Sequence, residues 1–201
     1  SSINLLNNAV DIDFFNQTYS EKKRKSYLTV LTCAAGFKNN PYKDLDTLLS
    51  AFEILSKNNN IKLIILGEKI SNYPDLNYLD IEFIDHISDV NKIRDIFIKC
   101  DVLVHSSNIE TWGFTVTEAL SLGIPVIASN VGGLKDQIRG YNIPNITGFS
   151  DNNYKLSEAN GFLFEKNNIN QLSYVLKYMI ENRDSRIIMG ENARLYASKN
   201  Y

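Results

Sequence analysis

The sequence holds few residues of the kinds that cross-link small domains or bind metals. It has two cysteines and two histidines among 201 residues. Two cysteines are too few for a disulfide framework, and with so few histidines a clustered metal site is not expected. Cys33 and Cys100 each lie in or beside an apolar run, which predicts buried free thiols in a reducing compartment.

Long apolar runs and an excess of charge are lacking too. No run approaches the roughly 18–20 apolar residues that a membrane span needs. The formal net charge is -2, so the global electrostatics give no reason to expect nucleic acid as a partner. These absences together favour a cytoplasmic protein.

The length and composition fit one domain. The chain is 44% hydrophobic and 22% charged, and 201 residues suffice for one α/β domain with a buried core. We expect residues 1–201 to form that domain, with 1–26 as an entry segment. The start lacks an initiator Met and an apolar signal core, which predicts a piece of a longer chain. The basic run KKRK at 22–25 is either a solvated loop or a peripheral contact with anionic lipid headgroups.

Short apolar runs alternate with longer stretches of helical period along the chain. Strands that are apolar on both faces and separated by helices imply a parallel sheet covered on both sides. The predicted fold class is therefore α/β, a Rossmann-like doubly wound sheet of about six strands. Strands are expected at 27–33, 61–66, 81–84, 101–105, 125–128 and 161–164, and helices at 44–56, 89–99, 114–122, 170–181 and 184–197.

Ligands of such sheets bind beyond the carboxyl ends of the strands, so the loops that follow the strands are the candidate sites. The segment 140–160 has no clear period. A long loop inside a compact domain is functional or mobile, so we interpret this segment as either a lid or an insertion loop.

The most informative segment is HSSNIETWGFTVTEAL at 105–120. A strand ends, a polar loop follows and a helix begins near Gly113. The first N–H groups of a helix lack acceptors and favour an anion such as a phosphate. Glycine at position 113 would allow a ligand to approach the backbone closely.

Two glutamates flank this helix start. Glu118 lies four residues from both Phe114 and Leu122, and a carboxylate among apolar neighbours needs partners, such as the two hydroxyls of a ribose. The alternative is an exposed or snorkelling side chain. Glu110 precedes the helix, where it is either a ligand contact or a generic acid that stabilises the helix dipole.

The spacing of these glutamates resembles glycosyltransferase family four, and six segments resemble motifs of that family in the same order. The family is known for an N-G-V-D entry, a K-G-x-D-x-L-I-x-A-F helix, strands that end in L-x-I-x-G and A-D-V-x-V-x-P-S, an E-A-x-A-x-G-x-P-V-I-A-T-x-x-G-G stretch and an N-G-F-L-V strand. The corresponding segments here are NAVD at 8–11, KDLDTLLSAF at 43–52, LIILG at 63–67, DVLVHSS at 101–107, EALSLGIPVIASNVGG at 118–133 and NGFLF at 160–164.

The resemblance implies the C-terminal, donor-binding half of a GT-B enzyme whose N-terminal domain holds the acceptor. It implies retaining hexosyl transfer from a nucleoside-diphosphate sugar, independent of metal or cofactor, with bacterial surface-glycan synthesis as its setting. The isolated half is expected to be inactive. The implied catalytic residues are Glu110 on the sugar hydroxyls and Lys43 on the leaving phosphate. The implied donor-binding residues are Glu118 on the ribose, the amides of Trp112, Gly113 and Phe114 on the pyrophosphate, His86 near the base, Gly36 and Lys38.

Lys43 also carries a clue of its own, because a cation at a helix start opposes the helix dipole unless an anion arrives. The alternative is a tolerated surface lysine. The family's arginine before this position is missing, and Lys38 is a candidate substitute, without the bidentate fork of a guanidinium. Trp112 either closes over the donor or packs. His86 is alternatively an ordinary loop residue, and His105, at the end of an apolar strand, is interpreted as structural.

Other functions are weighed against sugar transfer. A nucleotide-sugar epimerase would need acid/base residues that this segment hardly offers. A non-catalytic nucleotide-binding or interaction module would make Glu110 dispensable for activity. A dinucleotide-binding domain is disfavoured, because the first strand–helix loop lacks G-x-G-x-x-G.

Overall fold

The structure, a computed structural model, describes residues 27–33, 40–57, 60–67, 79–141 and 154–201. A six-stranded parallel sheet lies at its centre, in the order β3-β2-β1-β4-β5-β6. The strands are β1 (Leu28–Cys33), β2 (Ile61–Gly67), β3 (Ile81–Asp85), β4 (Val102–His105), β5 (Val126–Ser129) and β6 (Gly161–Phe164). This arrangement confirms the doubly wound Rossmann-like fold and all six expected strands.

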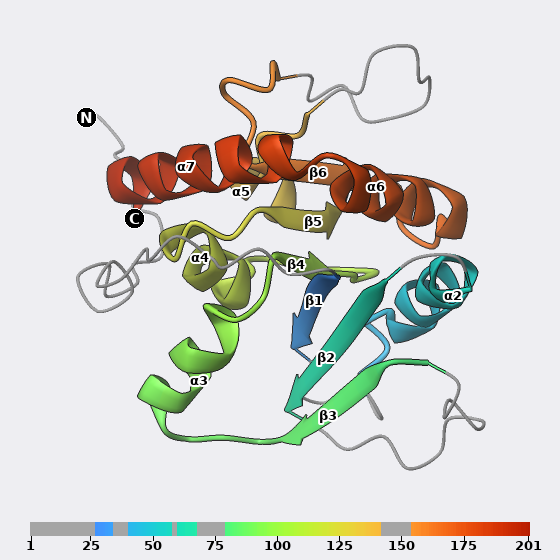
Figure 1. Cartoon of the computed structure of the whole chain (residues 1–201). Coiled ribbons are helices and arrows are strands. Elements are labelled where there is room, and N and C mark those ends of the chain that lie inside the picture. The colour runs from blue at the N-terminus through green and yellow to red at the C-terminus, as the bar shows by residue number, and fades with distance from the viewer. Residues whose placement is uncertain (1–26, 34–39, 58–59, 68–78, 142–153) are drawn as a thin grey trace.

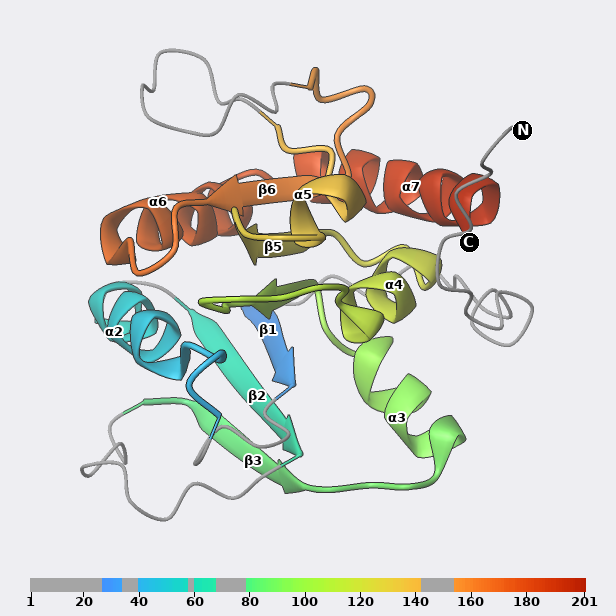
Figure 2. The ribbon, with the colours of Figure 1, turned by 180° about the vertical axis from the view of Figure 1, so that it is seen from behind.

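Helices cover both faces of the sheet (Figures 1 and 2). They are α2 (Leu45–Ser56), α3 (Val90–Phe97), α4 (Phe114–Ser121), α5 (Leu134–Gln137), α6 (Ile169–Glu181) and α7 (Arg183–Asn200). The four-residue α5 was not expected from the sequence, whereas the other five lie within a few residues of their predicted bounds. Residues 1–26 and 142–153 lie outside the described part, so the entry segment, the KKRK run and most of the 140–160 loop stay predictions.

Successive side chains of a strand point to opposite faces of the sheet, so the strands contribute to two separate cores, one on each face. Val30 packs in the core beneath α2 and α6, whereas Leu31 packs in the core beneath α3, α4 and the C-terminal half of α7. This alternation is why the apolar strands showed no polar face in the sequence.

The topology creates a switch point between β1 and β4. The chain adds β2 and β3 on one side of β1 and then returns to add β4 on the other. The loops that follow β1 and β4 therefore start side by side at the carboxyl edge of the sheet, where open α/β sheets bind ligands, and lead to α2 and α4 on opposite faces. Lys43 and Glu110 lie on these two loops.

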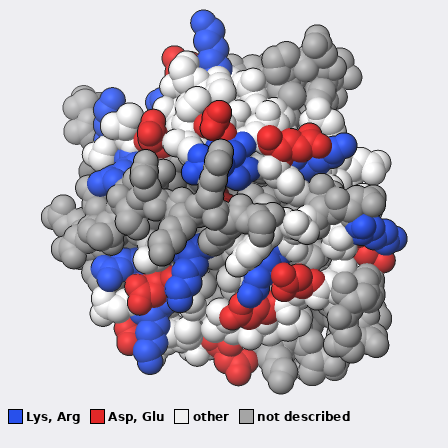
Figure 3. All heavy atoms as spheres, viewed as in Figure 1, with Lys and Arg blue, Asp and Glu red and all other residues white. Residues whose placement is uncertain are grey.

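The surface shows mixed charge. On the face in Figure 3, basic and acidic side chains are interspersed over the described residues. In the described part of the chain, no helix is long and apolar enough to span a membrane.

Candidate functional site

The loops after β1 and β4 are joined by backbone hydrogen bonds. Asp44 N–H donates to the Ser106 carbonyl at 3.2 Å, and Asn108 N–H donates to the Tyr42 carbonyl at 2.7 Å. Lys43 and Ser107 form an isolated antiparallel bridge. Because the strands beneath are parallel neighbours, this pairing fixes the backbone of Lys43 beside the loop that carries Glu110.

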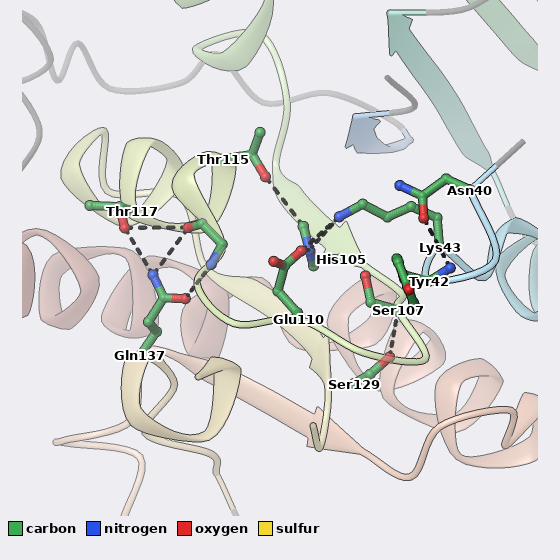
Figure 4. Close-up of polar contacts among 11 residues, drawn as sticks. Asn40, Tyr42, Lys43, His105, Ser107, Glu110, Thr115, Thr117, Ser129 and Gln137 are labelled. Carbon is green, nitrogen blue, oxygen red and sulfur yellow. Dashed lines mark hydrogen bonds and ion pairs between the residues drawn. The ribbon is translucent and has the colours of Figure 1, made fainter. Parts of the chain in front are cut away.

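Three side chains meet where the loops join (Figure 4). Lys43 Nζ lies 2.8 Å from Glu110 Oε2, and His105 Nε2 lies 3.0 Å from the same oxygen. Lys43 Nζ and His105 Nε2 are 3.2 Å apart. The Lys43 and Glu110 side chains are only 18% and 17% exposed, so water screens this ion pair weakly.

The hydrogen-bonding requirements of the cluster select one histidine tautomer. Nε2 lies within hydrogen-bond distance of both Glu110 and Lys43, but in a neutral ring it either donates or accepts. A carboxylate only accepts, and Lys43 already donates to Glu110, so the proton is best placed on Nε2, pointing at Glu110. The Thr115 hydroxyl, 3.2 Å from Nδ1, then donates to the other ring nitrogen. Burial lowers the pKa of His105, which keeps the ring neutral.

Glu110 is held in its ionised form. Burial alone would raise its pKa, but the hydrogen bonds from His105 and Lys43 lower the pKa to about 2. A carboxyl group with this pKa cannot serve as a general acid near neutral pH. It can accept hydrogen bonds from hydroxyl groups and stabilise positive charge.

The start of α4 lies directly after Glu110. Gly113 is the N-cap, and no side chain caps the helix. The Gly113 N–H donates to Gln137 Oε1 at 2.9 Å, so this amide is not offered to a ligand, contrary to the expectation from the sequence. A Cβ at Gly113 would lie 2.9 Å from Val116 Cγ2, so glycine is needed for packing here. The N–H groups of Phe114 and Thr115 lie in the first turn, which has no acceptors within the helix.

Glu118 lies one turn further along α4, on the same side as Thr115. It is half-buried, and burial raises its pKa to about 7. Its charge also raises the pKa of the Cys33 thiol at the end of β1, although burial of that thiol has the larger effect. Glu118 therefore lies beside the end of β1, at the switch point.

Comparison with known proteins identifies the family. The model for glycosyl transferases group 1 matches residues 38–196, which is most of the chain and includes every residue of this cluster. The chain belongs to this family.

Two of three similar proteins are longer than this glycosyl transferase domain. The chain is 32% identical to an uncharacterised glycosyltransferase of Methanocaldococcus jannaschii over 79% of its own length and 41% of that protein. Anabaena HepE in complex with UDP-glucose has a similar fold, with a TM-score of 0.73 at 18% identity over 98% of this chain and 52% of that one. The C-terminal domain of a group 1 glycosyl transferase from Francisella tularensis matches over 98% of its length, with a TM-score of 0.69 at 19% identity. The chain thus spans about half or less of the two longer proteins.

The other residues predicted for the site of this glycosyl transferase domain have different outcomes. Trp112 packs edge-to-face on Tyr201, with ring centroids 5.8 Å apart, which favours its packing role. His86 is exposed in the loop after the edge strand β3, and nothing in the structure tests a contact with a base. Gly36 and Lys38 lie outside the described residues.

His105 was interpreted as structural, and its contacts with Lys43 and Glu110 were not predicted from the sequence. Its position at the carboxyl end of a strand beside the switch point was the available signal. Among the described residues, no group of three or more His, Cys, Asp or Glu is placed to hold a metal ion. Independence from metal stays a prediction that follows from the family resemblance.

Proposed function

We propose that this domain binds the nucleoside-diphosphate sugar of a glycosyltransferase and presents it for transfer to an acceptor. The observation that carries the proposal is the Lys43–His105–Glu110 cluster. It places a cation and an ionised carboxylate together at the switch point, beside an uncapped helix start.

The chemistry of transfer suits this arrangement. When the bond between sugar and diphosphate breaks, negative charge develops on the leaving phosphate and positive charge at the anomeric carbon. Lys43 and the first-turn amides of α4 would stabilise the leaving phosphate. Glu110, ionised at its low pKa, would accept hydrogen bonds from the sugar hydroxyls and orient the sugar.

Glu118 is proposed to bind the nucleoside end of the donor. Because Glu118 is half-buried, its carboxylate oxygens have fewer water molecules as hydrogen-bond donors, and the two hydroxyls of a ribose would supply donors in their place. Glu118 and Glu110 would then lie on either side of the α4 start, with the diphosphate between the sugar and the ribose. The UDP-glucose bound by Anabaena HepE supports a sugar nucleotide as the ligand class.

The proposal extends to the full-length enzyme, its reaction and its location. A second, N-terminal domain would supply the acceptor site, which fits the extra length of the relatives, and this domain alone would turn over little. Retention of configuration, hexosyl transfer, metal independence and bacterial surface-glycan synthesis follow from the family resemblance. We also propose a cytoplasmic location, with peripheral membrane contact through residues 22–25.

The binding step can be tested by calorimetric titration of the purified chain with UDP, GDP, ADP and their glucose conjugates. We expect one preferred nucleoside. Lys43→Met should weaken the preferred diphosphate about tenfold or more, since a charge-assisted contact is lost. Glu110→Gln should weaken the sugar conjugate more than the free diphosphate.

The exposed pair Lys177–Glu181, with a 3.8 Å contact, supplies matched controls. Lys177→Met and Glu181→Gln remove the same charges elsewhere and should leave every affinity unchanged. Absence of binding to all six compounds by the folded wild-type chain would overturn the proposed function. Equal losses in the site and control variants would overturn the assigned roles.

A further inference from the structure

The short helix α5 contacts the segment from Glu110 to Gly113 at both of its ends. At one end, Gly133 N–H donates to the Glu110 carbonyl at 3.1 Å. A Cβ on Gly132 would lie 1.9 Å from that carbonyl oxygen, so the turn before α5 packs directly on the Glu110 backbone. At the other end, Gln137 binds the Gly113 peptide.

Gln137 makes three hydrogen bonds to the start of α4. Its Oε1 accepts from Gly113 N–H at 2.9 Å, and its Nε2 donates to the Gly113 carbonyl at 3.1 Å and to Thr117 Oγ1 at 2.8 Å (Figure 4). The side chain is completely buried. Only an amide offers one acceptor and two donors in this compact form, so neither a carboxylate nor an apolar side chain would satisfy all three groups.

These bonds act on the geometry of the helix start. Glycine at the N-cap leaves the backbone free to adopt several conformations, and α4 has no capping side chain to restrict it. Gln137 supplies the missing restriction from outside the helix. The amides of Phe114 and Thr115 follow directly, so their direction depends on how Gly113 is held.

We infer that Gln137 is a positioning residue for diphosphate binding: it fixes the Gly113 peptide and so orients the first-turn amides of α4 toward the phosphates. This inference rests on the proposed function. Gln137 does not touch the ligand itself, because its polar atoms are occupied by α4. The three hydrogen bonds of Gln137 go to Gly113 and Thr117 and none goes to Glu118, so the effect should be larger on the phosphates than on the nucleoside end.

The test compares a nucleoside diphosphate with its own nucleoside. The diphosphate is UDP, GDP or ADP, whichever the wild-type chain prefers, and the nucleoside is uridine, guanosine or adenosine to match. Gln137→Met keeps the volume and removes all three hydrogen bonds. We expect it to weaken the diphosphate about five- to tenfold, the range for losing oriented hydrogen bonds, and to leave the nucleoside affinity within about twofold.

Two further variants keep the test interpretable. Thr117→Val removes the bond from Gln137 Nε2 and the longer bond from Thr117 Oγ1 to the Gly113 carbonyl, at 3.3 Å, but retains both bonds of Gln137 to Gly113, so it should weaken the diphosphate less than Gln137→Met does. Gln171→Met is the matched control. The side chain of Gln171, in α6, also accepts a hydrogen bond from a backbone amide, that of Glu165, at 2.7 Å. It should change neither affinity. Hydrogen exchange should show faster exchange at the Gly113 amide in Gln137→Met alone.

Each outcome bears on one proposal. Equal losses of diphosphate and nucleoside affinity, or no loss of either, in folded Gln137→Met would overturn the positioning role. If Gln137→Met does not fold, the same comparison in Thr117→Val decides. A wild-type chain that binds no nucleoside diphosphate contradicts the proposed function itself, which is a different result.

Discussion

Ionisation of Glu118 should destabilise the empty domain as the pH rises, and Glu118→Gln should remove this effect. The pKa of Glu118 is about 7 in the folded chain and 4.5 in the unfolded reference. Between these values the unfolded carboxyl group has released its proton while the folded one still holds it. The free energy of unfolding therefore falls as the pH rises through this window, and the loss is complete above pH 7.

The size of the effect follows from the pKa difference. A gap of about 2.5 between the two pKa values corresponds to roughly 3 kcal/mol, and partial exposure of the side chain reduces this to about 2–3 kcal/mol. At pH 5 the same relation leaves less than about 1 kcal/mol. Glu118→Gln should thus be more stable than wild type at pH 8 and nearly equal to it at pH 5.

Urea unfolding of both chains at pH 5, 6, 7 and 8 measures this difference. Glu191→Gln, which removes an exposed carboxylate from α7, serves as the control and should show no such trend. If Glu118→Gln gains nothing at pH 8, or gains as much at pH 5 as at pH 8, the burial argument is refuted. A ligand adds a second check: the wild type should bind its nucleotide more tightly at pH 8 than at pH 6, and the more stable variant should bind it less well.

Three further predictions concern the cluster and its support. Lys43→Met should lower the free energy of unfolding by about 1–2 kcal/mol because Glu110 loses a hydrogen-bond donor. The double variant Lys43→Met/Glu110→Gln should be more stable than Lys43→Met alone. A double-mutant cycle that shows no coupling between the two residues would contradict this. Below pH 6.5 the wild type should lose stability, because burial lowers the pKa of His105 in the folded chain while the unfolded ring takes up a proton. His105→Gln should reduce this loss. Parallel profiles of unfolding free energy against pH for wild type and variant would refute the prediction. Gly132→Ala should cost more than about 2 kcal/mol in urea unfolding, since the residue has φ +44° and a Cβ would overlap the Glu110 carbonyl oxygen; wild-type stability would exclude that overlap.

The fold was predictable from the sequence because its signals are local. Six apolar runs of strand length gave all six strands, and periodic leucines in 45–55 gave α2. Asp44 and Asp89 cap their helices through hydrogen bonds to Thr47 N–H and Asn91 N–H, as residues of this type commonly do. The four-residue α5 was missed because a single turn is too short to show a period.

The site was only partly predictable because its geometry is not local. The motifs pointed to Lys43 and Glu110, and the structure places them 2.8 Å apart although 67 residues separate them in the chain. The pairing between the loops after β1 and β4, which creates this contact, has no sequence signal of its own. The same is true of Gln137, whose hydrogen bonds take the Gly113 amide, and of His105, whose apolar strand hid its polar contacts.

The contact between Lys43 and Glu110 has a consequence for the order of events at the site. A ligand that attracts Lys43 with its phosphate takes a partner from Glu110, and a half-buried carboxylate is costly to leave short of donors. A sugar nucleotide can return the donors as hydroxyls, whereas a bare nucleoside diphosphate cannot. On the proposed function, this exchange would favour the sugar nucleotide over the nucleoside diphosphate that remains after transfer, and Lys43 would pair with Glu110 again as that diphosphate departs.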